Sequence, residues 1–359
     1  MNTLNHWRVR YKMKVALIAD LHLGVKKSDR TFQESQLRFF KNQFVKELKE
    51  KEIDTIIVCG DIYDTRQAVN VQTENIVIDL FKNVLKDFKV HVVVGNHDIY
   101  HTTTTEVNSL KPLDLLPNVT VYETPTEVMI GNTEVLMLPW ITKYTDFDTI
   151  LAKKYKYAFA HLDIVGFDMG GGLSTEGVTI SQVIDKIDFT YTGHYHARSI
   201  KKFGEGEKTI TYIGSPYQIT RIDRGQARGY GILDLSNNDF EWFTNTESMI
   251  FTKYIYPNVD ESKIPGNQVD IEIPYDKQNE TKKIFDFVQH LNSLGPAYPI
   301  NTYNGDSPDN KTDLSIDVES LNLVGLFKSY IDEIETSLDK QELYNELIKL
   351  YDTFKGANQ

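Results

Sequence analysis

The chain has 359 residues, of which 40% are hydrophobic and 25% are charged, and its formal net charge is -12. This composition is typical of one or two globular domains with an apolar core, and it excludes a wholly disordered or fibrous chain. One cysteine excludes a disulfide framework, and the acidic balance excludes a polycation that coats nucleic acid by counterion release.

The first hundred residues alternate between strands and helices. Residues 1–12 form an N-terminal extension without the apolar segment of a secretory signal. Short apolar runs at 14–19, 55–59 and 90–94 predict strands, and apolar residues at helical spacing predict helices over 30–51 and 73–85. This order implies a parallel sheet with right-handed crossovers.

The next stretch is richer in strands. Apolar runs predict strands at 119–122, 135–138, 157–160, 189–192, 209–213 and 229–235. Helical patterns there are short, at 146–154 and 180–184. Residues 13–250 are therefore predicted to form one mixed α/β sandwich.

A smaller unit and an acidic tail follow. Residues 251–305 contain predicted strands at 251–256 and 269–273 and a helix over 279–294. Residues 306–359 contain a linker and two amphipathic helices, and residues 301–359 carry a net charge of −7, against −5 for the rest of the chain. The tail helices suit a groove on a partner protein, and the alternative is that they pack back on the body as a hairpin. No apolar run is long enough to span a membrane, so we expect a cytoplasmic protein, in a host cell if the chain is viral.

Five of the predicted strands of the body are each followed by a polar segment. In chain order these segments are Asp20-Leu21-His22, Gly60-Asp61-Ile62-Tyr63-Asp64, Gly95-Asn96-His97-Asp98, Ala160-His161 and Gly193-His194-Tyr195-His196. Since ligands gather at the carboxyl ends of strands in open α/β sheets, we expect these segments to meet. Histidine, carboxylate and amide ligands suit manganese, iron or zinc, and two ions about 3.5–4 Å apart are typical of phosphate-ester hydrolysis. Each segment alone is also compatible with an ordinary turn, and only the ordered set of five favours a metal centre.

In this ordered set the chain resembles the calcineurin-like metallophosphoesterase superfamily, whose motifs read D-x-H, G-D-x-x-D, G-N-H-D/E, H and G-H-x-H. The segments Ala19-Asp-Leu-His-Leu-Gly24 and Tyr212-Ile-Gly-Ser-Pro-Tyr-Gln218 are similar to SbcD-type DNA double-strand-break repair nucleases. The short chain with an acidic helical tail is most similar to the recombination endonuclease subunits of T-even-like bacteriophages. The resemblance implies a four-layer αββα sandwich, a small α/β capping domain at 251–305 and a C-terminal helical segment that binds a partner.

The resemblance also implies two divalent metal ions, with Mn2+ expected and Mg2+ as the alternative, and a role for each site residue. The implied ligands of the first metal are Asp20, His22, Asp61 and His196, and those of the second are Asp61, Asn96, His161 and His194. His97 would protonate the leaving oxygen, and Asp98 would orient His97 by a hydrogen bond.

Partners are implied in the same way. They are DNA, an SMC-like coiled-coil ABC ATPase that binds residues 315–356, and a second copy of the chain. Phe39, Phe40 and Phe44 are candidates for the apolar core of that homodimer. The loop from Arg221 to Arg228 carries three arginines, which either contact the DNA backbone or are simply solvated.

The predicted function is a manganese-dependent DNA nuclease that acts as a 3′–5′ exonuclease on duplex ends and as an endonuclease on single strands. One alternative is a phosphodiesterase for nucleotides or small phosphate esters. The other is a scaffold subunit that clamps DNA ends without cleaving them.

Overall fold

The computed structural model describes residues 14–151, 153–169 and 172–305, together with Ile331, 339–341 and 343–346. The chain divides into two compact units, Met1–Asn304 and Gly305–Gln359. The predicted N-terminal extension and nearly all of the two predicted tail helices lie outside the described residues. The strands and helices with defined bounds all belong to the first unit. In the described part of the chain no helix combines the length and the apolar character needed to cross a lipid bilayer.

Two six-stranded sheets form the body. The first contains, in spatial order, β12 (Asp239–Thr244), β11 (Gly229–Asp234), β1 (Lys14–Ile18), β2 (Thr55–Val58), β3 (Lys89–Val93) and β4 (Val119–Tyr122). The second contains β5 (Thr126–Ile130), β6 (Thr133–Leu138), β7 (Tyr155–His161), β8 (Ile187–Gly193), β10 (Lys208–Tyr212) and β9 (Ser199–Phe203). The predicted parallel pairing of β1, β2 and β3 is confirmed, and β4 also pairs in parallel with β3. In these two sheets, the strands that the sequence did not predict are β5, β9 and β12, and all three lie at sheet edges, where a half-exposed strand has no continuous apolar run.

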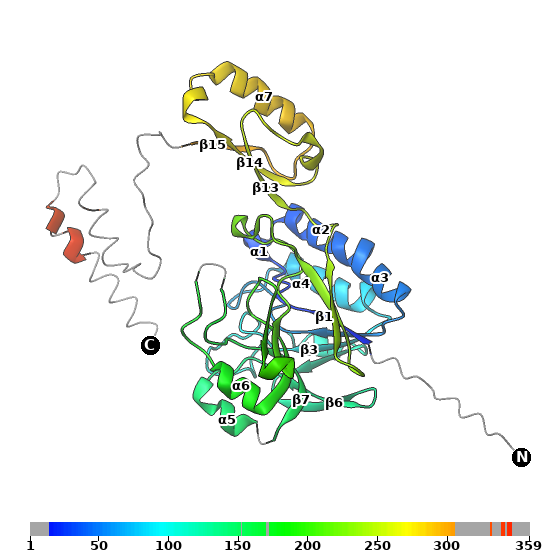
Figure 1. Cartoon of the computed structure of the whole chain (residues 1–359). Helices are drawn as coiled ribbons and strands as arrows, with labels where there is room; N and C mark the ends of the chain where they lie inside the picture. Colours follow the sequence, from blue (N-terminus) through cyan, green and yellow to red (C-terminus); the bar gives the residue numbers. More distant parts are fainter. Residues whose placement is uncertain are drawn as a thin grey trace, which may run out of the picture. The chain divides into compact units, whose positions relative to one another are not determined.

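Helices cover the outer faces of the two sheets, as Figure 1 shows, with α2, α3 and α4 over the first sheet and α5 and α6 beside the second. The helical segments are α2 (Arg30–Arg38), the π-helical turn η1 (Phe39–Phe44), α3 (Val45–Glu50), α4 (Val71–Asp79), the π-helical turn η2 (Leu80–Val84), α5 (Phe147–Ile150) and α6 (Ile180–Lys186). Short 3₁₀ turns are η3 (Leu113–Leu115), η4 (Tyr144–Asp146), η5 (Gly204–Gly206), η6 (Arg221–Asp223), η7 (Glu261–Lys263) and η8 (Tyr275–Lys277). The segment labelled α1 (Val25–Ser28) is a turn whose last three residues have positive φ.

Alternating side chains of the strands fill separate cores. Val15 and Leu17 of β1 point into the core between the two sheets, whereas Ala16 and Ile18 pack under the helices of the first sheet. A third core lies between the second sheet and α5 and α6. Because a strand buried on both faces needs apolar residues at every position, β1 and β2 read as continuous apolar runs. The four-layer αββα arrangement is therefore confirmed.

The predicted role of Phe39, Phe40 and Phe44 in a dimer core is wrong. All three rings are buried inside the chain, with exposed fractions of 0%, 1% and 0%. They pack on one another, and Phe39 and Phe44 also contact the ring of Tyr230. Their apolar spacing marks the inner face of the helix, which the first sheet covers.

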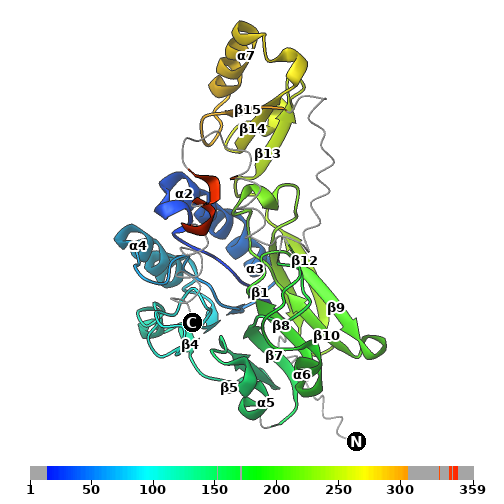
Figure 2. The ribbon, with the colours of Figure 1, turned by 90° about the vertical axis from the view of Figure 1, so that its left-hand side faces the viewer.

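Residues 251–304 form a small subdomain within the first unit, which we call the cap. Its strands β13 (Phe251–Ile255), β14 (Gln268–Ile273) and β15 (Asn301–Asn304) are parallel, and α7 (Thr281–Ser293) lies along one face of this sheet in Figure 2. A separate apolar core fills the space between them. A further cluster of Phe32, Met249 and Phe251 joins the cap to the body. The cap therefore has both its own core and a packed junction with the body.

Candidate metal centre

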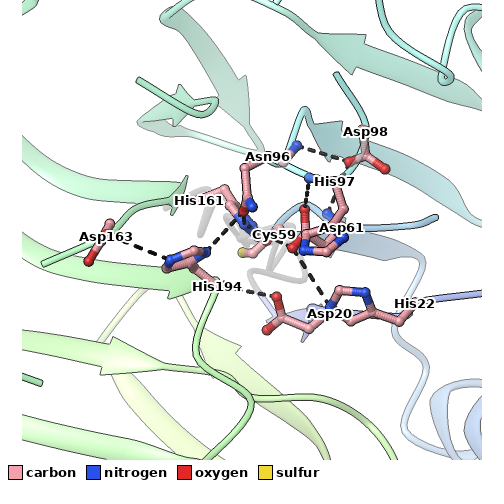
Figure 3. A network of polar contacts seen from close by, with 12 residues as sticks. Asp20, His22, Cys59, Asp61, Asn96, His97, Asp98, His161, Asp163 and His194 are labelled. Atoms are coloured by element: carbon pink, nitrogen blue, oxygen red, sulfur yellow. Dashed lines mark hydrogen bonds and ion pairs between the residues drawn. The ribbon is translucent and has the colours of Figure 1, made fainter. Parts of the chain in front are cut away.

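Five strands from both sheets end at one place, and they bring together the polar segments that the sequence singles out. The ends of β1, β2 and β3 come from the first sheet, and the ends of β7 and β8 come from the second (Figure 3). We call the seven predicted metal ligands the ligand cluster: Asp20, His22, Asp61, Asn96, His161, His194 and His196. The structure places all seven side chains in this cluster.

The ligand cluster contains two groups of three that are compact enough to hold an ion. In each group the ligand atoms lie within 4.8 Å of one another; the groups are Asp20, His22 and His196, and Asp61, His161 and His194. A third group of the same compactness joins His22 and Asp61 to His97, which lies beside the cluster. The Oδ2 atom of Asp61 lies 3.3 Å from Nε2 of His161 and 3.7 Å from Nε2 of His22, so this carboxylate faces both groups. The Oδ1 atom of Asn96 lies 2.9 Å from His161 Nε2 and 3.0 Å from His194 Nδ1.

The backbone that carries these ligands is strained. Asp20, His22, Asp61 and His194 have positive φ values of 54°, 41°, 55° and 99°. Such conformations cost non-glycine residues about 1–3 kcal/mol each and are concentrated at functional sites. The third motif needs a glycine at position 95, because a Cβ there would lie 2.2 Å from Oδ1 of Asp61.

The donor set fits divalent cations. The Oδ2 atom of Asp20 is buried and accepts no hydrogen bond from the described residues. A buried carboxylate oxygen without a hydrogen bond is unfavourable, and a bound cation would stabilise it. The Nε2 atoms of His22 and His196 lie 3.0 Å apart. Two nitrogens bound to one metal at about 2.1 Å in adjacent positions lie about 3 Å apart, so these imidazoles are already placed to share an ion.

The electrostatics of the cluster follow from burial and from its opposite charges. Burial raises the pKa of Asp20 to about 6, although His161 opposes the shift. Burial also disfavours the charged form of Asp61, but His161 and the other nearby imidazoles hold the pKa of this carboxylate well below its usual range.

The imidazoles differ from one another in the same way. Burial alone would lower the pKa of His161, but the adjacent Asp61 carboxylate raises it to about 9. Burial lowers the pKa of His194 and of His196 to about 3. His194 and His196 are therefore neutral at pH 7, as a metal-binding imidazole must be, and His161 would have to release a proton to bind a cation.

His97 lies beside the cluster and is anchored from two sides. Its backbone N–H donates to Oδ1 of Asp61 over 2.8 Å, and its ring Nδ1 lies 2.6 Å from the carbonyl oxygen of Asp64. A carbonyl only accepts, so Nδ1 carries the hydrogen and Nε2 is the nitrogen left for another partner. The ring stands edge-on to His22, with 4.8 Å between the centroids.

The prediction that Asp98 orients His97 is wrong in its contact. The Asp98 carboxylate is 1% exposed and accepts four backbone N–H groups instead, from Asp61, Ile62, Tyr63 and Gly95, over 2.9–3.1 Å. The Asp64 carbonyl holds the His97 ring. Asp98 ties the turn after β2 to the turn after β3, and so it positions Asp61 and the backbone of His97 together.

Two residues near the cluster were not among the sequence predictions. The Asp163 carboxylate lies 3.9 Å from Nε2 of His194, points toward this ring in Figure 3, and accepts hydrogen bonds from Ser174 and Tyr195. The ring of Trp140 lies 5.1 Å from that of His194. Asp163 follows His161 at the same alternate spacing as His22 follows Asp20, and this spacing was the available signal.

Three comparisons with known proteins each give matches, of which one from each is described. A family model described as calcineurin-like phosphoesterase matches residues 13–198. A curated protein, "Exonuclease subunit 1" of Enterobacteria phage T4, is 25% identical over 350 residues, which cover 94% of this chain and 98% of the phage protein. A solved structure of a dimetal phosphatase from Danio rerio is 11% identical, with a TM-score of 0.39. The match covers 62% of this chain and 93% of the phosphatase chain.

Proposed function

Since this chain belongs to the calcineurin-like phosphoesterase family, we propose that it is a manganese-dependent DNA nuclease. The proposed activities are 3′–5′ exonuclease on duplex ends and endonuclease on single strands. The observation that carries the proposal is the pair of three-residue groups, one with Asp20 and one with Asp61, in which the Asp61 carboxylate also faces His22 of the other group and the His97 ring lies beside them. DNA is the proposed substrate because the aligned phage protein is named an exonuclease and matches across 94% of this chain, which includes most of the cap.

The proposed ligands divide between two ions. Asp20, His22 and His196 would hold the first, His161, His194 and Asn96 would hold the second, and Asp61 would bridge them. Two divalent ions bound here would lower the pKa of a water molecule and neutralise charge on the phosphate oxygens. The Asp20 oxygen without a hydrogen bond and the facing nitrogens of His22 and His196 support this division.

His97 is proposed as the proton donor to the leaving oxygen of the substrate. Its Nδ1 is engaged by the Asp64 carbonyl, which fixes the ring and reserves Nε2 for a ligand. His97 is also half-buried beside Asp61, so its ring would lie close to a phosphate group bound at the metals. Asp98 keeps His97 in place through the backbone of the two turns, as a positioning residue.

A protein partner is part of the proposal. The phage relative is named a subunit, which supports an assembly with a second protein. We propose that an SMC-like ABC ATPase binds residues 315–356, most of which lie outside the described part of the chain, and that the chain also forms a homodimer. Deletion of residues 306–359 should abolish capture of such an ATPase and leave metal-dependent hydrolysis intact.

The test compares three substrates and one variant pair. The purified chain is assayed with Mn2+, with Mg2+ and with EDTA on a blunt duplex labelled at its 3′ ends, on a hairpin, and on bis(p-nitrophenyl) phosphate. We expect Mn2+-dependent cleavage of DNA, lowered about 10²–10⁴-fold by His97→Asn with bound metal unchanged. His91→Asn is the matched control, because His91 lies on the neighbouring β3 with the Tyr122 hydroxyl as its partner.

Each other outcome contradicts a stated part of the proposal. Hydrolysis of the small diester alone indicates a phosphodiesterase for nucleotides or small esters. DNA binding without cleavage of any substrate indicates a scaffold. Loss of metal from His97→Asn shows that His97 is a ligand rather than a proton donor.

A further inference from the structure

A second polar cluster lies next to the ligand cluster in the body. It contains four arginines: Arg198, two residues after His196, and Arg221, Arg224 and Arg228 on the loop that the sequence left open between DNA contact and solvation. We call these four residues, with the carboxylates of Asp223 and Asp270, the arginine cluster. Neither sequence interpretation is right for the whole loop, because its arginines are engaged in the protein to very different extents.

Two of the arginines hold the cap. Arg221 donates to the Asp270 carboxylate of β14 through Nε at 2.7 Å and Nη2 at 3.1 Å, and Arg224 donates through Nη2 at 2.7 Å. Asp270 is 3% exposed, so this pairing takes place inside the junction between body and cap. Arg221 is thereby fully explained as a structural residue.

The other two arginines are incompletely paired. Arg228 is 4% exposed and donates through Nη2 to Asp223 and Gln226, over 2.5 and 2.8 Å, but its Nε and Nη1 atoms have no acceptor among the described residues. Arg198 donates through Nη2 to the Phe243 carbonyl over 2.6 Å and stacks on Trp242, and its buried Nε also has no acceptor. The buried Nε of Arg224 is in the same state.

These unpaired donors and charges are energetically unfavourable without a ligand. A buried donor that lacks an acceptor costs about 1–3 kcal/mol, and more when the group is charged. The cluster holds four cationic groups against two carboxylates. An anion would therefore supply both the missing acceptors and the missing negative charge.

Space for such an anion adjoins both arginines. A cavity of about 490 Å³ lies between the loop at 224–228 and the start of the cap at 248–254, and Arg228 lines it. A second cavity of about 800 Å³ is lined by Arg198. Gln226 and Ala227 line both cavities, so the two cavities adjoin at this part of the loop.

We propose that Arg198 and Arg228 form an anion subsite that binds a phosphate group of a nucleic-acid strand, next to the one being hydrolysed. Guanidinium groups bind phosphate oxygens through paired N–H donors, which is the chemistry that the unpaired nitrogens offer. Arg198 lies within about 7 Å of His196 along the chain, which places the subsite beside the metal centre. That the phosphate belongs to DNA rests on the proposed function, whereas the anion subsite itself does not.

The first experiment separates the subsite from the reaction centre. Arg198→Gln and Arg228→Gln are assayed on an oligodeoxynucleotide and on bis(p-nitrophenyl) phosphate, which has no flanking phosphate. We expect kcat/KM to fall about 10–100-fold on the oligonucleotide, mainly through KM, and to change less than about twofold on the small diester. Arg221→Gln is the matched control, because it removes the same charge from the same loop without lining either cavity. An equal loss in Arg221→Gln, or an equal loss on both substrates, overturns the subsite.

A second variant guards against misfolding. Gln226→Glu places a carboxylate oxygen where Gln226 Oε1 already accepts from Arg228. We expect the melting temperature in EDTA to rise by about 2–4 °C and the affinity for the oligonucleotide to fall. If Gln226→Glu binds the oligonucleotide as tightly as the unaltered chain, the proposal is wrong.

The source of the phosphate is identified with three probes in EDTA: inorganic phosphate, thymidine 5′-monophosphate and a thymidine tetranucleotide. Stabilisation of the unaltered chain that Gln226→Glu lacks supports the subsite. If only the tetranucleotide stabilises the chain, the ligand is a strand, and if the monophosphate does so equally, the ligand is a released product. No stabilisation by any probe overturns the subsite. A chain that hydrolyses the small diester but not DNA refutes the proposed function, while this thermal test of the subsite still stands.

Discussion

The ligand cluster and the arginine cluster come within two residues of each other in the chain, at His196 and Arg198. They differ in what their buried atoms lack, because the first lacks a positively charged partner and the second lacks a negatively charged one. The ligand cluster gathers carboxylate and imidazole atoms, and one of its buried oxygens has no hydrogen bond. The arginine cluster gathers N–H donors, and four of its buried nitrogens have no acceptor in the part of the chain that the structure describes. In the proposals above, cations would complete one cluster and an anion the other, and together these ions match the charges of a metal-bound phosphodiester.

The two clusters also differ in how the backbone holds them. Four residues of the ligand cluster have positive φ at the ends of strands, whereas none of the four arginines does. The ligands are thus fixed by two rigid sheets. Two of the arginines instead depend on Asp270 of the cap for their position. The comparison therefore predicts that changes to the ligand cluster affect chemistry most, and that changes to the arginine cluster affect stability and substrate binding.

The largest effect is expected from Asp61→Asn. This carboxylate faces both groups of ligands, and its loss should lower hydrolysis of DNA and of the small diester on the order of 10³-fold or more. Bound manganese, measured by elemental analysis, should fall below two per chain. Asp87→Asn is the control, because Asp87 is an exposed partner of Lys49. Unchanged activity in Asp61→Asn would remove the basis for the metal assignment.

The next largest effect is expected from Asp223→Asn, on stability. Asp223 accepts from Arg228 and from the backbone N–H groups of Ile219 and Thr220. Removing this charge leaves Arg228 buried without any anion, which should lower the free energy of unfolding by about 3–5 kcal/mol in urea titrations. Added phosphate should recover part of the loss. A variant as stable as the unaltered chain would show that the arginine cluster is not short of negative charge.

Asp98→Asn is expected to give a smaller change. An amide has one acceptor oxygen, so it leaves backbone donors of one turn without a partner and should destabilise the chain by about 1–3 kcal/mol. Activity on DNA and on the small diester should fall together, because both turns move. If thermal unfolding is unchanged while the pH profile of cleavage shifts, Asp98 acts on the His97 ring after all.

The smallest effect is expected from Asp163→Asn. Asp163 stands behind His194 and is held by Ser174 and Tyr195, so its loss should loosen one ligand without removing it. We expect manganese affinity, measured by titration calorimetry, to weaken about 10-fold. The melting temperature of the metal-free chain should change little. A change in affinity as large as that of Asp61→Asn would place Asp163 among the direct ligands.

The sequence alone determined the parallel order of β1, β2 and β3, the helices over 30–51 and 73–85, and the meeting of the seven residues of the ligand cluster at the strand ends. These predictions hold because they depend on local periodicity and on the rule that strand ends meet at one edge of a sheet. A residue that directly follows a buried strand is placed by that strand, whatever the loops beyond it do.

Only the tertiary structure decided what the remaining side chains contact. Asp98 binds two turns rather than a ring, Phe44 packs inside the chain rather than on a second copy, and Arg221 pairs with a carboxylate 49 positions away. Each of these contacts joins segments that are distant in sequence, so no local pattern encodes it. The net charge of −12 likewise hides a local group of four arginines, because a sum over the chain carries no information about which charges the fold places side by side.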